Sequence, residues 1–155
     1  MHLFNSEFTE KSKKFEGVAF TVRTLNTTKR AERDAKIAAD RLQYTRLSAE
    51  RATKFKELVG EDGTLEERNA KVNAMPLERR VDLLYLDEQA QHIYDSVIAP
   101  NTIRAALISV TGLELNGAKE PTIEQIIADA PDELLAEIHE ACVRGSGLTE
   151  GEAKN

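Results

Sequence analysis

Apolar residues recur along the chain at two different spacings. Between residues 17 and 25, Val18, Phe20 and Val22 alternate with other residues, and this period of two predicts a β-strand. The stretch 3–8 is a candidate partner strand, with the polar residues 9–14 as the hairpin loop. Beyond residue 26 the apolar spacing changes to three and four, which is typical of helices. A small N-terminal hairpin followed by helices is therefore expected.

The first predicted helix covers about 30 residues. Thr27 or Thr28 can act as its N-cap, and neither Gly nor Pro follows until Gly60. Alanine predominates on its apolar stripe, and because alanine buries little area the seam should be weak and should permit close approach of another helix. Two interpretations stay open: a surface helix packed on its own domain, or a helix that docks a partner or a second copy. The stripe comprises Ala31, Ala35, Ala38, Leu42, Thr45, Ala49 and Ala52, and its first four residues are the candidate protein contacts.

A second long helix is predicted from residue 77, directly after Pro76, to Ile98. Its apolar residues recur at helical spacing, so we expect this helix to form the centre of the core. Pro100 should end it, and a shorter helix over 101–110 should follow. The inward residues are predicted to be Val81, Leu84, Tyr85, Ala90, Ile93, Tyr94 and Val97 on the second helix, and Ile103, Leu107 and Val110 on the third.

The closing segment contains a series of turn and cap signals. Asn116-Gly117 is a strong turn dipeptide, and Thr122 with Gln125 fits a capping box that opens a short helix. Pro131 suits the first position of another helix. That last helix should bury Leu134, Leu135, Ile138 and Cys142.

These segments predict a mainly α protein of one domain. It would comprise a β-hairpin at 1–25, a helical core with two long helices at 26–111, and a C-terminal helical module and tail at 112–155. Its 155 residues are enough to bury a core, although aromatics at 5% and the absence of Trp make that core lean. No run of 18 apolar residues and no basic, apolar leader occurs, so a cytosolic protein without a membrane segment is expected.

Charge is distributed unevenly between the two parts of the chain. Residues 1–59 carry 13 Lys and Arg against 8 Asp and Glu, whereas residues 60–155 carry 8 against 19. Such asymmetry favours head-to-tail attraction between copies, or a partner with the opposite layout. Nucleic-acid binding is disfavoured, because acidic residues interrupt the basic stretch and few aromatics are present to stack on bases.

The sequence contains no complete catalytic or metal-binding motif. His139 and Cys142 have a spacing that suits zinc, but a structural site needs four ligands and two are missing. Glu88 and His92 lie at i and i+4, which is either an acid–base pair or, as we prefer, a surface contact. No phosphate-binding glycine motif occurs. We therefore predict a non-enzymatic protein with no catalytic residues, no cofactor and no metal.

Two segments nevertheless resemble a known family. The closing string contains GLxxNG, PT, PDELLAEI and GLTEGEAKN between residues 112 and 155, and Gly17–Arg23 is similar to the family's opening strand. Both resemble tail assembly chaperones of long-tailed bacteriophages. The likeness covers about 45 residues with some specificity and about ten more weakly.

The resemblance implies a protein of the host cytoplasm that is absent from the mature virion. It would coat the tape measure protein, keep it soluble and then give way to tail tube subunits, with self-association by head-to-tail stacking as a further possibility. The alternative is a structural subunit of the virion, in the head–tail connector or neck, which would use the same helices in a fixed ring.

Overall fold

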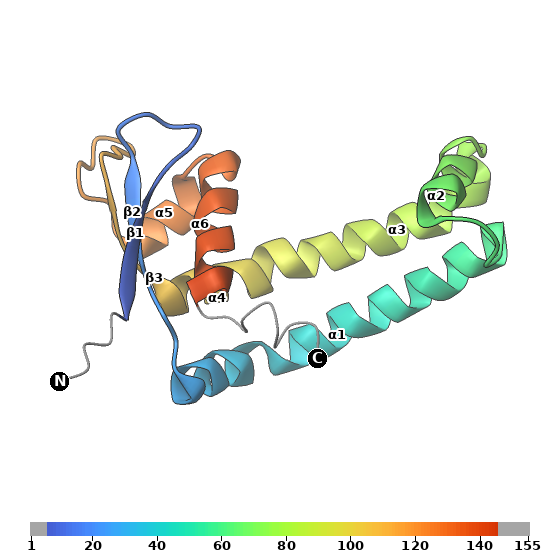
Figure 1. The fold of residues 1–155 in the computed structure, drawn as a ribbon, viewed down its shortest axis with the longest axis horizontal. Coiled ribbons are helices and arrows are strands. Elements are labelled where there is room, and N and C mark those ends of the chain that lie inside the picture. The colour runs from blue at the N-terminus through green and yellow to red at the C-terminus, as the bar shows by residue number, and fades with distance from the viewer. Residues whose placement is uncertain (1–5, 146–155) are drawn as a thin grey trace. The chain divides into compact units, whose positions relative to one another are not determined.

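The computed structural model of the chain describes residues 6–145. It is mainly helical (66%), as predicted, whereas the expected two-stranded hairpin is part of a small three-stranded antiparallel sheet. The chain divides into two compact units. Within the described residues, the sheet unit comprises residues 6–37 and 99–145, and the hairpin unit, named for its pair of long helices, comprises residues 38–98 (Figure 1). The single domain expected for the whole chain stays a prediction.

The sheet consists of β1 (Glu7–Lys11), β2 (Ala19–Arg23) and β3 (Leu107–Thr111), in the order β1-β2-β3. The predicted strand at 17–25 is confirmed as β2. Its partner β1 extends to Lys11, so residues 9–11, predicted to be loop, are strand; residues 3–5 of the expected partner lie outside the described part of the chain.

The third strand corrects the helix predicted over 101–110. Helix α4 (Ala99–Ala106) ends at Ala106, and β3 then pairs with β2, placing Val110 opposite Phe20. The sequence of β3, Leu-Ile-Ser-Val-Thr, is rich in β-branched residues that favour a strand once a neighbouring strand supplies hydrogen bonds. Leu107 and Val110 are buried as expected, but they lie on strand β3 and not on a helix.

The core of the sheet unit lies between the sheet and helices α4, α5 (Ile123–Asp129) and α6 (Asp132–Gly145). Figure 1 shows α6 packed on one face of the sheet. The predicted stripe of α6 is confirmed, with Leu134, Ile138 and Cys142 fully buried and Leu135 partly buried. The buried core residues of this unit are Val18, Phe20, Val22, Leu25, Ile103, Ala106, Leu107, Val110, Ile126, Ala130, Leu134, Ile138, Ala141 and Cys142.

Local signals in the closing segment are also confirmed. Leu115 and Ala118 form an isolated antiparallel bridge, and Asn116 and Gly117 between them both have positive φ, as a two-residue turn of this kind requires. The Thr122 hydroxyl accepts a hydrogen bond from the backbone N–H of Gln125, while the Gln125 side chain accepts one from the N–H of Thr122. This reciprocal pair is the capping box expected at the start of α5.

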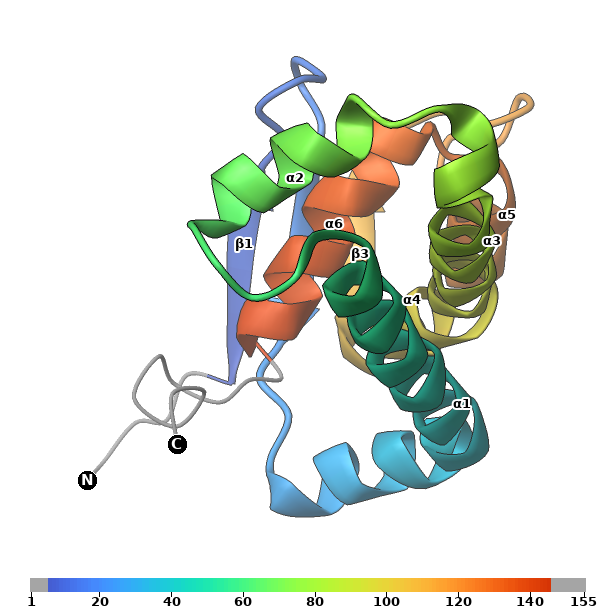
Figure 2. The same ribbon diagram turned by 90° about the vertical axis from the view of Figure 1, so that its right-hand side faces the viewer.

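The hairpin unit contains most of α1 (Thr27–Val59), α2 (Leu65–Asn73), α3 (Leu77–Ile93) and a short π-helical segment, η1 (Tyr94–Ile98). The first long helix is confirmed, but its cap is Asn26, whose Oδ1 accepts from the Lys29 N–H, and not Thr27 or Thr28. The second is confirmed in part, because its last turn has π geometry and the chain continues through Pro100 into α4 instead of ending there. Within this unit α1 and α3 lie side by side, and α2 lies across the end where the chain reverses (Figures 1 and 2). A capping box of Thr64 and Glu67 opens α2.

Candidate interaction surfaces on the helical hairpin

The two long helices of the hairpin unit contact each other through large side chains. Phe55 of α1 packs with Val72 and Leu83, with Leu58 and Val59 at the edge of the cluster. Further along, the rings of Tyr44 and Tyr94 lie with their centroids 6.0 Å apart. These contacts define the inner faces of α1 and α3, and the opposite face of each helix is its outer face.

The alanine stripe of α1 does not form this seam. Ala31, Ala35, Ala38 and Leu42 are all exposed, and Leu42 retains 54% of its accessible surface. Leu47 and Phe55 are buried instead, because large side chains remove more apolar area from water than alanine methyl groups do. Among residues 6–145 the stripe is therefore not packed in the core, and its contact with a partner stays a prediction.

Helix α3 differs from the prediction in the same way. Its inner face buries Leu83 and Leu86, whereas three residues expected in the core are exposed. The helix has two apolar faces and only one can pack against α1, so the other remains in solvent. We call this outer set the α3 ridge: Leu77, Val81, Leu84 and Tyr85, which are 60%, 50%, 44% and 59% exposed.

The spacing of the α3 ridge is that of one continuous helical face. Its residues follow the pattern i, i+4, i+7, i+8. Scattered apolar residues on a surface need no explanation, but a contiguous row on a helix is typical of a protein–protein contact. The sequence does show this periodicity; what it does not show is that the row lies outside the core.

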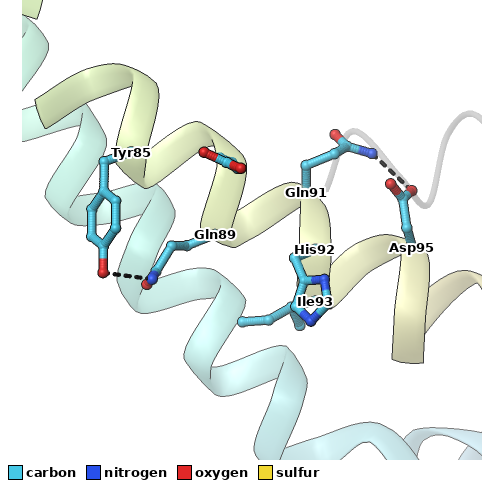
Figure 3. A pocket seen from close by; sticks show the side chains of 7 residues that line it. Tyr85, Gln89, Gln91, His92, Ile93 and Asp95 are labelled. Carbon is cyan, nitrogen blue, oxygen red and sulfur yellow. Dashed lines mark hydrogen bonds between the residues drawn. The ribbon is translucent and has the colours of Figure 1, made fainter. Parts of the chain in front are cut away.

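A shallow groove of about 700 Å³ continues from Tyr85 toward η1 (Figure 3). Two hydrogen bonds order its rim: the Gln89 amide donates to the Tyr85 hydroxyl at 2.7 Å, and the Gln91 amide donates to Asp95 Oδ1 at 2.8 Å. The groove is lined by Tyr85, Glu88, Gln89, Gln91, His92, Ile93 and Asp95. The lining thus combines amide and carboxylate groups with the apolar side chain of Ile93.

Glu88 and His92, which lie at i and i+4, both line this groove. Both residues are exposed. General acid–base catalysis requires a positioned substrate and groups with matched pKa values, usually in a protected site. An open helix surface does not supply that protection, so the arrangement favours a contact surface over chemistry.

His139 and Cys142 of α6 lie in the sheet unit, where Cys142 is fully buried. Burial raises the pKa of the Cys142 thiol to about 12 and lowers the pKa of His139. A thiol with such a pKa is a poor nucleophile and a poor metal ligand. Within residues 6–145 no group of three or more His, Cys, Asp and Glu side chains is placed to hold a metal ion.

No helix in the described part of the chain is both long and apolar enough to cross a bilayer. Comparison with family models, curated proteins and solved structures found no match for this chain.

Proposed function

We propose that this protein is a non-enzymatic assembly chaperone that binds a helical client through the α3 ridge. The observation that carries the proposal is the row of four large apolar side chains left in solvent on a well-formed helix. An apolar row at i, i+4 and i+7 matches the apolar row of another amphipathic helix. The adjoining groove continues along α3 and η1 from Tyr85 to Asp95.

The size of the surface suits temporary binding. Four apolar residues bury far less than the interfaces of permanent complexes, which exceed about 2,000 Å². A chaperone that must later release its client benefits from many modest contacts along an extended chain. Modest binding still protects the client by mass action, because client that is bound to the chaperone is not available to aggregate.

The resemblance to tail assembly chaperones supplies the identity of the proposed client. On that basis the client is the tape measure protein of a long-tailed phage, and tail tube subunits displace the chaperone as the tube grows. The protein would then act in the host cytoplasm and be absent from the mature virion. The resemblance supports these statements, and the α3 ridge supports only the binding of a helix.

The test is co-expression of the candidate tape measure protein with the chain. We expect the client to be soluble and to co-purify with the wild-type chain, and to precipitate with the double variant Val81→Glu and Leu84→Glu. Val143 of α6, which is 47% exposed in the sheet unit, offers the matched control Val143→Glu. Circular dichroism of each variant establishes that it is folded.

A client that stays equally soluble with the ridge variant would contradict this proposal. Detection of the chain in purified particles would favour the alternative, a virion subunit of the connector or neck, because a chaperone leaves before maturation.

A further inference from the structure

The two outer faces of the hairpin unit differ in charge. On α3, Glu78 and Asp82 directly follow Leu77 and Val81, and Glu88 lies one turn beyond Leu84; all three carboxylates are exposed. Arg80, which is partly buried, also borders the ridge. The α3 ridge is therefore an apolar row with a net acidic border.

On α1 the outer face has smaller residues and a different border. Its stripe within the hairpin unit comprises Ala38, Leu42, Thr45, Ala49 and Ala52, all exposed. Arg41 and Arg46 stand beside Leu42 and Thr45 and are exposed as well, while Glu50 borders the far end. We call this set, which omits Ala31 and Ala35 of the sheet unit, the α1 stripe. The charged residues beside its first half are basic.

We propose that the α3 ridge of one copy packs on the α1 stripe of a second copy. Bulky side chains on one helix fit between the small residues of another, because alanine lets the two backbones approach closely. The acidic border of the ridge then faces Arg41 and Arg46 of the second copy. Opposite charge around an apolar contact selects this partner and this surface over others.

The alternative pairing of two α3 ridges is disfavoured by the same charges. It would bring the Glu78, Asp82 and Glu88 carboxylates of one copy near those of the other, and like-charge juxtaposition weakens such a contact. The preferred contact joins two different surfaces, so each copy keeps one of each surface free. Such a contact adds copies head to tail instead of closing as a two-fold dimer.

The contact between copies does not depend on the proposed function. Combined with that function, the contact regulates client binding. The α3 ridge is also the proposed client site, so a client helix and a second copy compete for the same residues. That competition rests on the proposed function. A chain free of client would cover its ridge with another copy and expose it again when client appears.

Two charge-reversed variants test the contact. Variant one carries Arg41→Glu and Arg46→Glu on the α1 stripe, and variant two carries Glu78→Lys and Asp82→Lys beside the α3 ridge. Molar mass is measured by sedimentation equilibrium at rising concentration and at low and high salt. We expect the wild type to associate with rising concentration, less so in high salt, and each variant alone to associate at least about tenfold more weakly.

An equimolar mixture of the two variants decides the outcome. The unchanged ridge of variant one then meets the unchanged stripe of variant two, and the two reversed surfaces also complement each other. The mixture should therefore regain association. A wild type that stays monomeric, a variant one that associates as well as the wild type, or a mixture that stays monomeric would each overturn the proposal. Circular dichroism confirms the fold of both variants.

Client solubility separates this inference from the proposed function. Variant one keeps the whole α3 ridge, so it should still solubilise the client although it no longer associates with itself. If the Val81→Glu and Leu84→Glu variant loses client binding but associates with itself normally, the copy-to-copy contact is contradicted and the client site is supported.

Discussion

Arg51 of α1 donates from Nε to Asp87 Oδ1 of α3 at 2.7 Å, and its guanidinium also lies 5.3 Å from the centre of the Phe55 ring. This one side chain thus joins the ion pair between the two helices to the apolar cluster beneath it. Both charged groups remain partly exposed, at 37% and 49%. Exposed pairs are worth up to about 1 kcal/mol, and a ring contact adds about 0.5–1 kcal/mol.

Replacing Arg51 by Met should therefore lower the free energy of unfolding of the hairpin unit by about 1–2 kcal/mol, because Met keeps the aliphatic stem but loses both interactions. Urea unfolding followed by circular dichroism measures the change. Asp87→Asn is the matched control, since it removes the ion pair and leaves the Phe55 contact. Equal losses in the two variants would show that the ring contact contributes nothing.

The Glu10–Arg144 pair should make the sheet unit sensitive to acid. The hydrogen bond and charge of Arg144 hold the pKa of Glu10 below its ordinary value of 4.5. A depressed folded-state pKa gives stability that is present above pH 4.5 and is lost as the pH falls through the folded-state pKa. We expect Glu10→Gln to lower the melting temperature at pH 7 and to have a smaller effect at pH 3.

The reciprocal variant separates this pair from the other carboxylates of the chain. In an Arg144→Met background the pKa of Glu10 loses its main cause of depression, so Glu10→Gln should change stability equally at both pH values. A pH-dependent effect of Glu10→Gln that persists there would assign the acid sensitivity to another group.

Gly112 should tolerate no side chain. Its φ is +75°, and a Cβ at this position would collide with the carbonyl oxygen of Gly17. Left-handed backbone costs a non-glycine residue about 1–2 kcal/mol, and overpacking adds about 1–3 kcal/mol. We expect Gly112→Ala to destabilise the protein by about 3 kcal/mol in thermal or urea unfolding.

Gly117 provides the control for strain alone. Its φ is +84°, but a Cβ added there would meet no atom within 4 Å, so Gly117→Ala should cost only about 1–2 kcal/mol. If the two alanine variants lose the same stability, the close approach of Gly17 and Gly112 is not significant.

Cys142 should report the opening of the sheet unit. Because burial removes the thiol from solvent and raises its pKa to about 12, iodoacetamide should not label it in the folded protein at pH 8. Labelling, followed by mass spectrometry, should rise with denaturant in parallel with the loss of helical circular dichroism. Rapid labelling without denaturant would mean that α6 opens on its own.

Much of the secondary structure follows from local patterns. The alternation around Phe20 predicts β2, and the uninterrupted run from Thr27 to Gly60 predicts α1. The capping box at Thr122 and the turn at Asn116 are also correct, because each depends on residues no more than three positions apart. Strand β3 is not predicted, since residues 107–111 become a strand only through hydrogen bonds to β2, far away in the sequence.

The candidate surface is predicted less well than the elements that carry it. The sequence alone determines that α1 and α3 are helices with apolar rows, because periodicity and capping act within a few residues. Only the tertiary structure decides which row is buried. Each helix offers more than one apolar face, and the choice depends on contacts between helices, such as Phe55 with Leu83 and Arg51 with Asp87, that no local pattern contains.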